Sequence, residues 1–246
     1  MELGLKGRTA IVGGASSGMG LAIAEALTTE GANVAMFARR RDLLEREAER
    51  LGALPVRGDL TNPSHIDALV EQTLAAFGTV DVLVLNGGGP PPGRASTLTT
   101  ELVEGAVELL LTSHVRLVGL CLPHLRSSGH GRIVAVEGTS VLEPIPNLVL
   151  SNAIRAGVVG WLRTLAREVG PDGVTVNTIA PGRIDTERLR SLSPDGNPPS
   201  QNDDISLRRI GTAREIADVV CFLASERASY VTGTVIPVDG GLVLGS

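Results

Sequence analysis

In Ala10-Ile11-Val12-Gly13-Gly14-Ala15-Ser16-Ser17-Gly18-Met19-Gly20, an apolar run breaks into glycines, and an apolar helical pattern follows at once in Leu21–Leu27. A strand, a tight turn and a helix in this order are typical of a dinucleotide-binding unit. Gly14 permits the turn, Gly18 lets a pyrophosphate approach the backbone, and Gly20 packs the helix against the strand. We expect the phosphates at the helix N-terminus, where free N–H groups and the helix dipole stabilise an anion.

Length and composition favour one α/β domain. The chain has 246 residues, 43% of them hydrophobic, and a net charge of −5. This length and this share of hydrophobic residues are enough for a sizeable core, so we expect a single domain over residues 1–246. The acidic balance argues against nucleic acid and against an anionic membrane surface as partners. Residues 1–6 are too polar for a signal peptide and no membrane span is evident, so we expect a cytoplasmic protein.

The cysteines and histidines give no indication of a metal site. Cys121 and Cys221 are far apart and lack metal-ligand spacing, so we expect two buried free thiols and no metal. His65, His124 and His130 stand in polar surroundings and are expected at the surface.

Short apolar runs typical of strands alternate with longer helical patterns along the whole chain. The predicted strands are Thr9–Gly13, Asn33–Ala38, Leu54–Arg57, Val82–Leu85, Ile133–Val136, Thr175–Ile179 and Val235–Val238. The predicted helices are Met19–Thr29, Asp42–Leu51, Pro63–Phe77, Thr100–His124, Asn152–Val169 and Ala213–Ala224. Strict alternation predicts a Rossmann-type α/β fold, a doubly wound seven-stranded parallel sheet flanked by helices.

Two stretches interrupt the alternation. The glycine- and proline-rich Gly87–Gly93 and the polar Ser191–Asp204 are predicted loops, and both follow strand ends, where such a sheet binds ligands. The second is long enough to serve as a substrate lid, which we place at residues 186–209.

Five landmarks lie in order along nearly the whole chain: the glycines at 14, 18 and 20, then Asp59-Leu60, Asn86-Gly87-Gly88, Pro181-Gly182 and Val238-Asp239-Gly240-Gly241. Together they resemble the short-chain dehydrogenase/reductase family. The resemblance implies a cofactor site made by Gly14, Ser16, Ser17, Gly18, Met19 and Gly20 at the first turn, Asp59 and Leu60 after the third strand, Asn86 and Gly87 after the fourth, and Pro181, Gly182 and Ile184 after the sixth, with Val238-Asp239-Gly240-Gly241 as the C-terminal signature. Gly13 departs from the pattern, because the family usually has threonine there.

Charge after the second predicted strand indicates the cofactor. An NAD site places a carboxylate there for the ribose hydroxyls, whereas an NADP site places arginine for the 2′-phosphate. This chain reads Arg39-Arg40-Arg41 and has no carboxylate at the strand end. Guanidinium groups match phosphate geometry, so we expect NADP(H), with Arg39 as the first candidate and Arg40 as the second. The alternative is that these arginines begin a solvated helix and pair with Glu45 or Glu47.

The catalytic positions that the resemblance implies are occupied by other residues. Family members transfer hydride with a tyrosine that supplies the proton, a lysine four residues later, a serine and an asparagine. The only tyrosine here is Tyr230 and the only lysine is Lys6. The resemblance places the tyrosine and lysine positions on Ser151 and Arg155, the serine position on Gly138 and the asparagine position on Leu110.

The residues that remain suggest substitute roles. Arg155 can bind the nicotinamide ribose and stabilise an oxyanion. Thr139 or Ser140 can orient the substrate. Ser151, Thr139, Ser140 or a water would have to deliver the proton, although a serine hydroxyl is a poor acid. Glu137 ends an apolar strand, where either burial raises its pKa into the range of a general acid or Arg155 pairs with it. His114, one turn after Leu110, either faces the cleft or is structural.

Three functions therefore remain open. The first is an NADP(H)-dependent oxidoreductase of the carbonyl or 3-oxoacyl type with a non-standard site. The second is a reaction without net redox change, such as a lyase, dehydratase or isomerase step. The third is an inactive homologue that still binds the cofactor. Apolar positions spread around the helices Thr100–His124 and Asn152–Val169, including Val115, Leu117, Val118, Val158, Val159 and Trp161, suggest a homodimer or homotetramer, as is common in the family.

Overall fold

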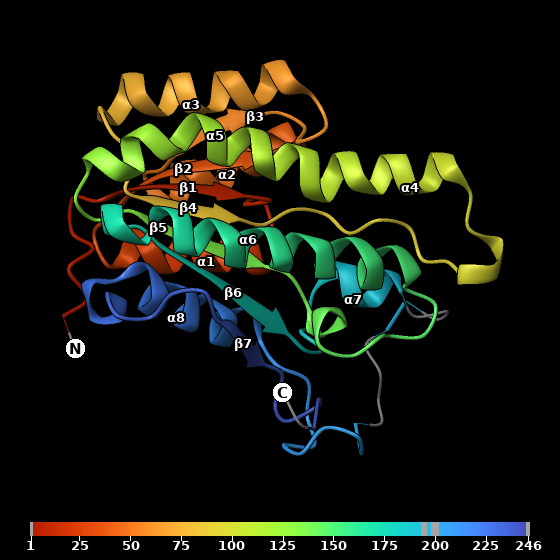
Figure 1. Ribbon diagram of the computed structural model, residues 1–246. Helices are drawn as coiled ribbons and strands as arrows, with labels where there is room; N and C mark the ends of the chain where they lie inside the picture. The colour runs from red at the N-terminus through yellow and green to blue at the C-terminus, as the bar shows by residue number, and fades with distance from the viewer. Residues whose placement is uncertain (1, 193–195, 198–201, 245–246) are drawn as a thin grey trace.

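Strand β1 (Thr9–Gly13) lies inside the sheet and pairs in parallel with β2 (Asn33–Ala38) on one side and β4 (Val82–Leu85) on the other. The remaining strands are β3 (Leu54–Arg57), β5 (Arg132–Val136), β6 (Thr175–Pro181) and β7 (Val235–Val238). The computed structural model describes residues 2–192, 196–197 and 202–244, and its seven-stranded sheet has the order β3-β2-β1-β4-β5-β6-β7 (Figure 1). Successive strands are added on one side of β1 up to β3 and on the other side from β4 on, and a parallel sheet has its binding crevice at this switch point, at the carboxyl ends of the strands.

Helices cover both faces of the sheet (Figure 1). One face carries α1 (Gly18–Thr29), α2 (Arg41–Leu51) and α8 (Ala213–Ala224). The other carries α3 (Pro63–Phe77), α5 (Ser113–Ser127) and α6 (Ala156–Val169). Neighbouring strand residues point to opposite faces. Thus Val12 belongs to the core under α1 and α8, and Ile11 to the core under α3, α5 and α6.

The predicted long helix Thr100–His124 runs to Ser127 and is not regular. It consists of α4 (Thr100–Val107), a π-helical turn (Glu108–Thr112) and α5. A second π-helical turn, Ser151–Arg155, precedes α6. The predicted lid at 186–209 contains a short helix, α7 (Glu187–Ser191), and lies partly outside the described residues. The helix ends at Ser191, the first residue of the predicted loop Ser191–Asp204, and the Thr186 hydroxyl caps its start by accepting a hydrogen bond from the Leu189 N–H.

The helix Thr100–Ser127 is long and apolar enough, by length and composition alone, to cross a membrane, which the sequence pattern had not suggested. Leu117, Cys121 and Leu125 on this helix are buried in the core of the sheet. Core packing therefore explains the apolar character of these positions.

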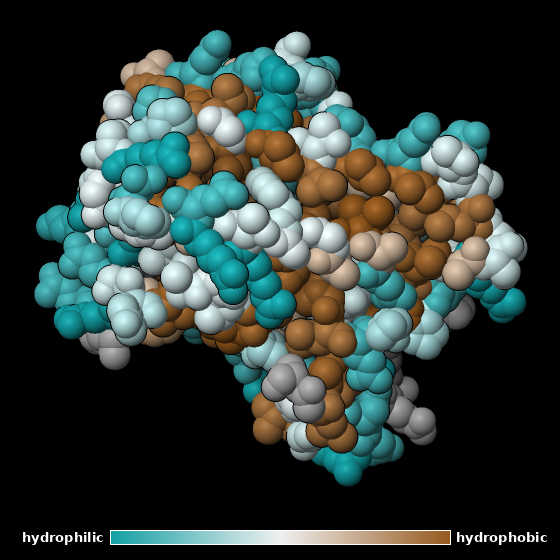
Figure 2. All heavy atoms as spheres, viewed as in Figure 1, coloured by the Kyte–Doolittle hydropathy of each residue, from teal (hydrophilic) through white to brown (hydrophobic). Residues whose placement is uncertain are grey.

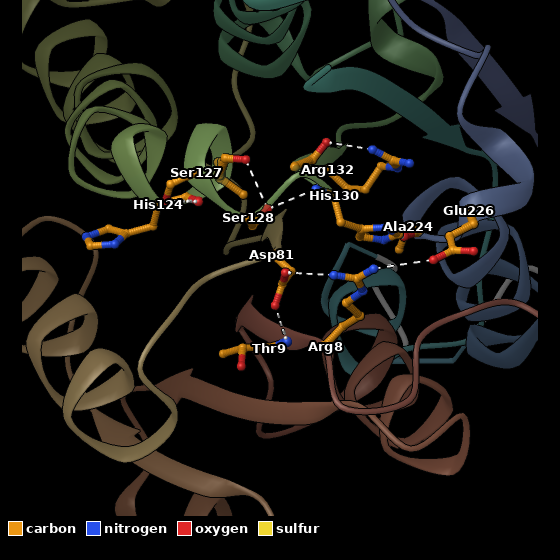
Figure 3. A network of polar contacts seen from close by, with 12 residues as sticks. Arg8, Thr9, Asp81, His124, Ser127, Ser128, His130, Arg132, Ala224 and Glu226 are labelled. Carbon is orange, nitrogen blue, oxygen red and sulfur yellow. Dashed lines mark hydrogen bonds and ion pairs between the residues drawn. The ribbon is translucent and has the colours of Figure 1, made fainter. Parts of the chain in front are cut away.

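A polar network ties together the amino ends of the strands (Figure 3). The Asp81 carboxylate accepts a hydrogen bond from the Thr9 N–H at 2.8 Å and pairs with Arg8, which also contacts Glu226. His130 is buried, and its Nε2 lies 2.9 Å from the Ala224 carbonyl oxygen. The expectation of a surface His130 is therefore wrong, because the chain turns inward at β5 and places the ring against the end of α8.

Candidate active site

The glycine-rich turn forms one wall of a cavity of about 470 Å³ at the carboxyl ends of β1, β2 and β4. Gly14 and Gly18 have φ of 60° and 57°, a left-handed conformation that favours glycine. A Cβ on Gly20 would lie 2.3 Å from the Gly14 carbonyl oxygen, so only glycine lets α1 approach the strand this closely. The N-terminus of α1, a twelve-residue helix, therefore opens onto the cavity with its free N–H groups.

Asn86 joins the ends of β1 and β4 beneath this turn. Its Nδ2 donates a hydrogen bond to the Gly13 carbonyl oxygen at 2.9 Å. A Cβ on Gly13 would lie 2.3 Å from the Asn86 carbonyl oxygen. The departure from threonine at Gly13 thus accompanies a close approach of the two strand ends.

Arg39 and Arg40 both line the cavity but are held differently. The Arg39 side chain is exposed, with Nη1 3.8 Å from Asp59 Oδ2. Arg40 Nη1 donates to Glu187 Oε2 at 2.9 Å, and its Nη2 donates to the Ser17 hydroxyl. The alternative pairing with the following helix does occur, but for Arg41, which contacts Glu45.

The donors of this cavity fit a phosphorylated dinucleotide. The cavity is lined by the N-terminus of a helix, by a glycine turn whose space a Cβ would fill, and by two guanidinium groups. All predicted residues of the first turn and of the third and fourth strand ends line it, namely Gly14, Ser16, Ser17, Gly18, Met19, Gly20, Arg39, Arg40, Asp59, Leu60, Asn86 and Gly87.

A second cavity of about 640 Å³ adjoins the first. Met19, Asn86, Thr186 and Arg188 line both cavities, so the two spaces meet at these residues. The remaining predicted residues line the second cavity, namely Glu137, Thr139, Ser140, Ser151, Arg155, Pro181, Gly182 and Ile184.

Glu137 and Arg155 form a buried ion pair beside this second cavity. Arg155 Nη1 lies 2.7 Å from Glu137 Oε2, and the two side chains are 11% and 0% exposed. Burial raises the pKa of Glu137 even though the charge and hydrogen bond of Arg155 oppose the shift. Glu137 Oε1 is buried and has no hydrogen-bond partner among the described residues. Glu137 therefore pairs with Arg155, as one alternative predicts, and burial raises its pKa in the direction that the other predicts.

Three hydroxyl-bearing residues that are close in sequence to this ion pair line the second cavity. Thr139, Ser140 and Ser151 are buried residues that line the cavity, and none forms a side-chain hydrogen bond within the described part of the chain. A Cβ on Gly138 would meet only Ser140 Oγ, at 3.8 Å, so a side chain has room there.

Leu110 and His114 line neither described cavity. Leu110 is buried in the π-helical turn of the long helix. His114 is buried, and its Nδ1 lacks a hydrogen-bond partner among the described residues. Burial, with the charge of Arg155, lowers the pKa of His114 to about 3. His114 is therefore neutral, and of the two expectations the structure favours the structural one.

Two residues of α7 at the cavity rim were not foreseen. Glu187 pairs with Arg40, and Arg188 Nη2 donates to the Pro90 carbonyl oxygen at 2.7 Å. The only signal in the sequence was the charged run Glu187-Arg188 directly after Thr186, within the predicted lid.

Cysteine chemistry and metal ligation find no support in the described residues. Cys121 and Cys221 are free and buried, as expected, and burial raises the pKa of both thiols to about 12. Within residues 2–192, 196–197 and 202–244, no group of His, Cys, Asp and Glu is arranged to hold a metal ion.

Comparisons with known proteins agree with this architecture. Residues 14–243 match the family model described as Enoyl-(Acyl carrier protein) reductase. The chain is 35% identical to the 3-oxoacyl-[acyl-carrier-protein] reductase FabG of Escherichia coli (strain K12), over 98% of this chain and 100% of the relative. It is 33% identical to a cyclohexanol dehydrogenase of Rhodococcus sp. (strain TK6), over 98% of both chains.

Solved structures lead to the same family. L-sorbose reductase from Gluconobacter frateurii, complexed with NADPH and L-sorbose, superposes with a TM-score of 0.93 at 31% identity over 100% of both chains. A mutant of a Serratia marcescens short-chain dehydrogenase/reductase gives a TM-score of 0.88 at 29% identity, over 97% of this chain and 98% of that one. The chain belongs to the short-chain dehydrogenase/reductase family.

Proposed function

We propose that the chain is an NADP(H)-dependent oxidoreductase of the carbonyl or 3-oxoacyl type with a non-standard active site. The observation that carries the proposal is the junction of two cavities, one with phosphate-binding donors and one with buried proton-holding groups. The similarity to reductases, one of them complexed with NADPH, supports the same reading.

The first cavity would hold the cofactor. The N-terminus of α1 would bind the pyrophosphate, and Arg39 and Arg40 would bind the 2′-phosphate. Arg155 would donate to the nicotinamide ribose from the second cavity. NADP(H), when bound, supplies or accepts a hydride at its nicotinamide ring.

The chain's own residues would handle the proton. Glu137 has a raised pKa and an unpartnered Oε1, so it holds a proton more readily than an ordinary carboxyl group. Its side chain is 0% exposed, so its proton would reach the substrate through a neighbouring group. A hydroxyl of Thr139, Ser140 or Ser151 would pass the proton to the substrate oxygen, while the Arg155 guanidinium stabilises negative charge there.

Neither the tyrosine nor the lysine of this chain lies at the site, so a reaction without net redox change and an inactive homologue are the two alternative functions. Tyr230 is 102% exposed and Lys6 is exposed, and neither lines a described cavity. A lyase, dehydratase or isomerase step would use Arg155 and Glu137 as electrostatic groups, and an inactive homologue would use neither.

A nucleotide titration followed by stopped-flow absorbance separates the three functions. NADPH is mixed with the protein and a panel of ketones and 3-oxoacyl thioesters. Oxidation of NADPH supports the proposal. Conversion of a substrate with NADPH unchanged supports the reaction without net redox change, and tight binding without any turnover supports the inactive homologue.

We also propose a small-molecule substrate, a cytoplasmic location and a homodimer or homotetramer. The net charge of −5 supports a partner other than nucleic acid or an anionic membrane.

A further inference from the structure

Arg188 occupies the junction of the two cavities. It belongs to α7, it lines both spaces, and its Nη2 donates to the Pro90 carbonyl oxygen at 2.7 Å. A Cβ on Gly89 would lie 2.8 Å from Arg188 Nη2 and 3.1 Å from its Cζ. The guanidinium therefore rests in space that only a glycine at position 89 leaves free.

This guanidinium lacks the neutralising partner that the other arginines of the second cavity have. Arg155 pairs with Glu137, and Arg183 pairs with Asp204. Within the described part of the chain, Arg188 forms no ion pair. Burial and then the charge of Arg155 lower the pKa of Arg188, so the two positive charges act on each other across the site. The junction thus carries a positive charge that a bound anion would neutralise.

Most of the wall beyond Arg188 is apolar. Ile145, Leu148, Leu189, Leu192, Leu242 and Val243 line the second cavity. The remaining carboxylate on the wall, Glu143, is exposed on the loop that follows β5. A ligand that matches this surface has an apolar body and one anionic group near the junction.

We propose that Arg188 binds a carboxylate of the substrate, so that the substrate class is an oxo acid with an apolar body. This inference rests on the proposed reductase function. A carboxylate accepts two parallel hydrogen bonds from a guanidinium, which fixes the orientation of the substrate. The reaction adds a hydride to the carbonyl carbon and a proton to its oxygen, and it yields a hydroxy acid and NADP⁺.

The test compares 2-oxo-4-phenylbutanoate with its ethyl ester, which keeps the ketone and the apolar body but lacks the charge. In Arg188→Gln, the KM for the acid should rise about 10- to 100-fold, the worth of a charge-assisted hydrogen bond, and the KM for the ester should change less than about two-fold. The dissociation constant of NADPH should also stay within about two-fold. Gly89→Ala, which displaces the guanidinium, should reproduce the effect.

Arg190→Gln is the matched control, because Arg190 is an exposed arginine of the same helix that pairs with Asp185 and lines neither described cavity. It should leave all constants unchanged. Equal losses for acid and ester together with weaker NADPH binding would mean that Arg188 binds the cofactor pyrophosphate, and would overturn the inference. An unchanged KM for the acid would overturn it as well.

A binding measurement keeps the inference separate from the proposed function. If no carbonyl compound is turned over, calorimetry with 4-phenylbutanoate and 4-phenylbutanamide on the complex with NADP⁺ decides the matter. Tighter binding of the carboxylate, lost in Arg188→Gln, supports the inference although the proposed function has failed. Equal binding of the two probes contradicts it.

Discussion

Arg39 and Arg40 are adjacent residues with different freedom to meet a phosphate. Arg39 is exposed and loosely paired with Asp59, whereas Arg40 is bonded to Ser17 and Glu187. We expect NADPH to bind more tightly than NADH, because the guanidinium groups favour the 2′-phosphate. Arg39→Asp should reverse this order in a titration of both nucleotides. Equal affinities in the unmutated protein would remove the argument.

Glu187 pairs with Arg40 and would therefore compete with a 2′-phosphate for this guanidinium. A 2′-phosphate that uses Arg40 must replace Glu187 as its partner. Glu187→Gln should therefore strengthen NADPH binding and leave NADH binding nearly unchanged. The opposite result would assign Arg40 to a purely structural role.

Glu137 should make the stability of the protein depend on pH. Its folded pKa is raised by burial, so at a pH above the unfolded value of about 4.5 the unfolded chain binds fewer protons than the folded one. Stability is thus lost as pH rises toward the folded pKa, at up to about 1.4 kcal/mol per pH unit. Urea unfolding between pH 5 and pH 8 should therefore show the stability of the unmutated protein falling relative to that of Glu137→Gln as pH rises, because the opposite contribution of His114 below about pH 6.5 is common to both proteins. A change at the exposed Glu143, Glu143→Gln, should leave the behaviour of the unmutated protein as it was.

At the scale of elements, the start of α6 decides the chemistry. The π-helical turn Ser151–Arg155 brings both of its end residues to the second cavity. The triple change Ser151→Tyr, Arg155→Lys and Gly138→Ser should install the usual catalytic groups, and Gly138 has room for a side chain. A positioned general acid contributes about 10²- to 10⁴-fold, so reduction of an activated ketone by NADPH should rise by a factor in that range.

Arg155→Ala is the converse test of the same element. If Arg155 holds the ribose, the variant should lose roughly 1.5–3 kcal/mol of nucleotide binding. An inert triple variant together with unchanged NADPH binding by Arg155→Ala would show that Ser151 and Arg155 do not occupy the tyrosine and lysine positions.

Elements with a strong local pattern were predictable from the sequence. The glycine turn and the seven strands follow from apolar runs and punctuating glycines, and the structure confirms the sheet. The π-helical turns were not predictable, because such turns are rare, single-turn features inside longer helices and no residue pattern in the sequence marks them. His130 and Arg188 were placed by tertiary contacts with Ala224 and Gly89, which no local pattern encodes.

At the scale of the whole molecule, acid should weaken the fold through His114. Its folded pKa is about 3, well below the unfolded value of about 6.5, so the unfolded chain binds a proton first as pH falls. Stability should decline from about pH 6.5 downward, by up to about 1.4 kcal/mol per pH unit. His114→Leu should flatten this decline in urea unfolding between pH 7 and pH 4. A replacement of the partly buried His124 should leave the slope as it was.

Assembly is the other property of the whole molecule. The structure buries Leu117, Val118, Val158 and Val159 within the protein, so the expectation that they form an exposed surface is wrong. Leu102 and Val115 remain 42% and 45% exposed, and Figure 2 shows apolar residues gathered over the side where α4 and α6 lie. We still predict a dimer or tetramer by light scattering at micromolar concentration, and Val115→Glu should shift it toward monomer. A monomeric unmutated protein would contradict the prediction.

The Arg8–Glu226 contact drawn in Figure 3 joins residues near the two ends of the chain, so on the ribosome it can form only after nearly the whole chain has been translated. The Glu226 N–H donates a hydrogen bond to the Leu3 carbonyl oxygen, and Arg227 Nε donates one to the Glu2 carbonyl oxygen. Arg8 contacts Glu226, which lies 218 residues further along the chain. At about 5–20 residues per second, translation delivers these partners roughly ten to forty seconds after the N-terminal segment. Until then Arg8 can pair with Asp81 but not with Glu226. A nascent chain stalled before Glu226 should accordingly be cut by protease near residues 2–8, and the completed chain should be protected there.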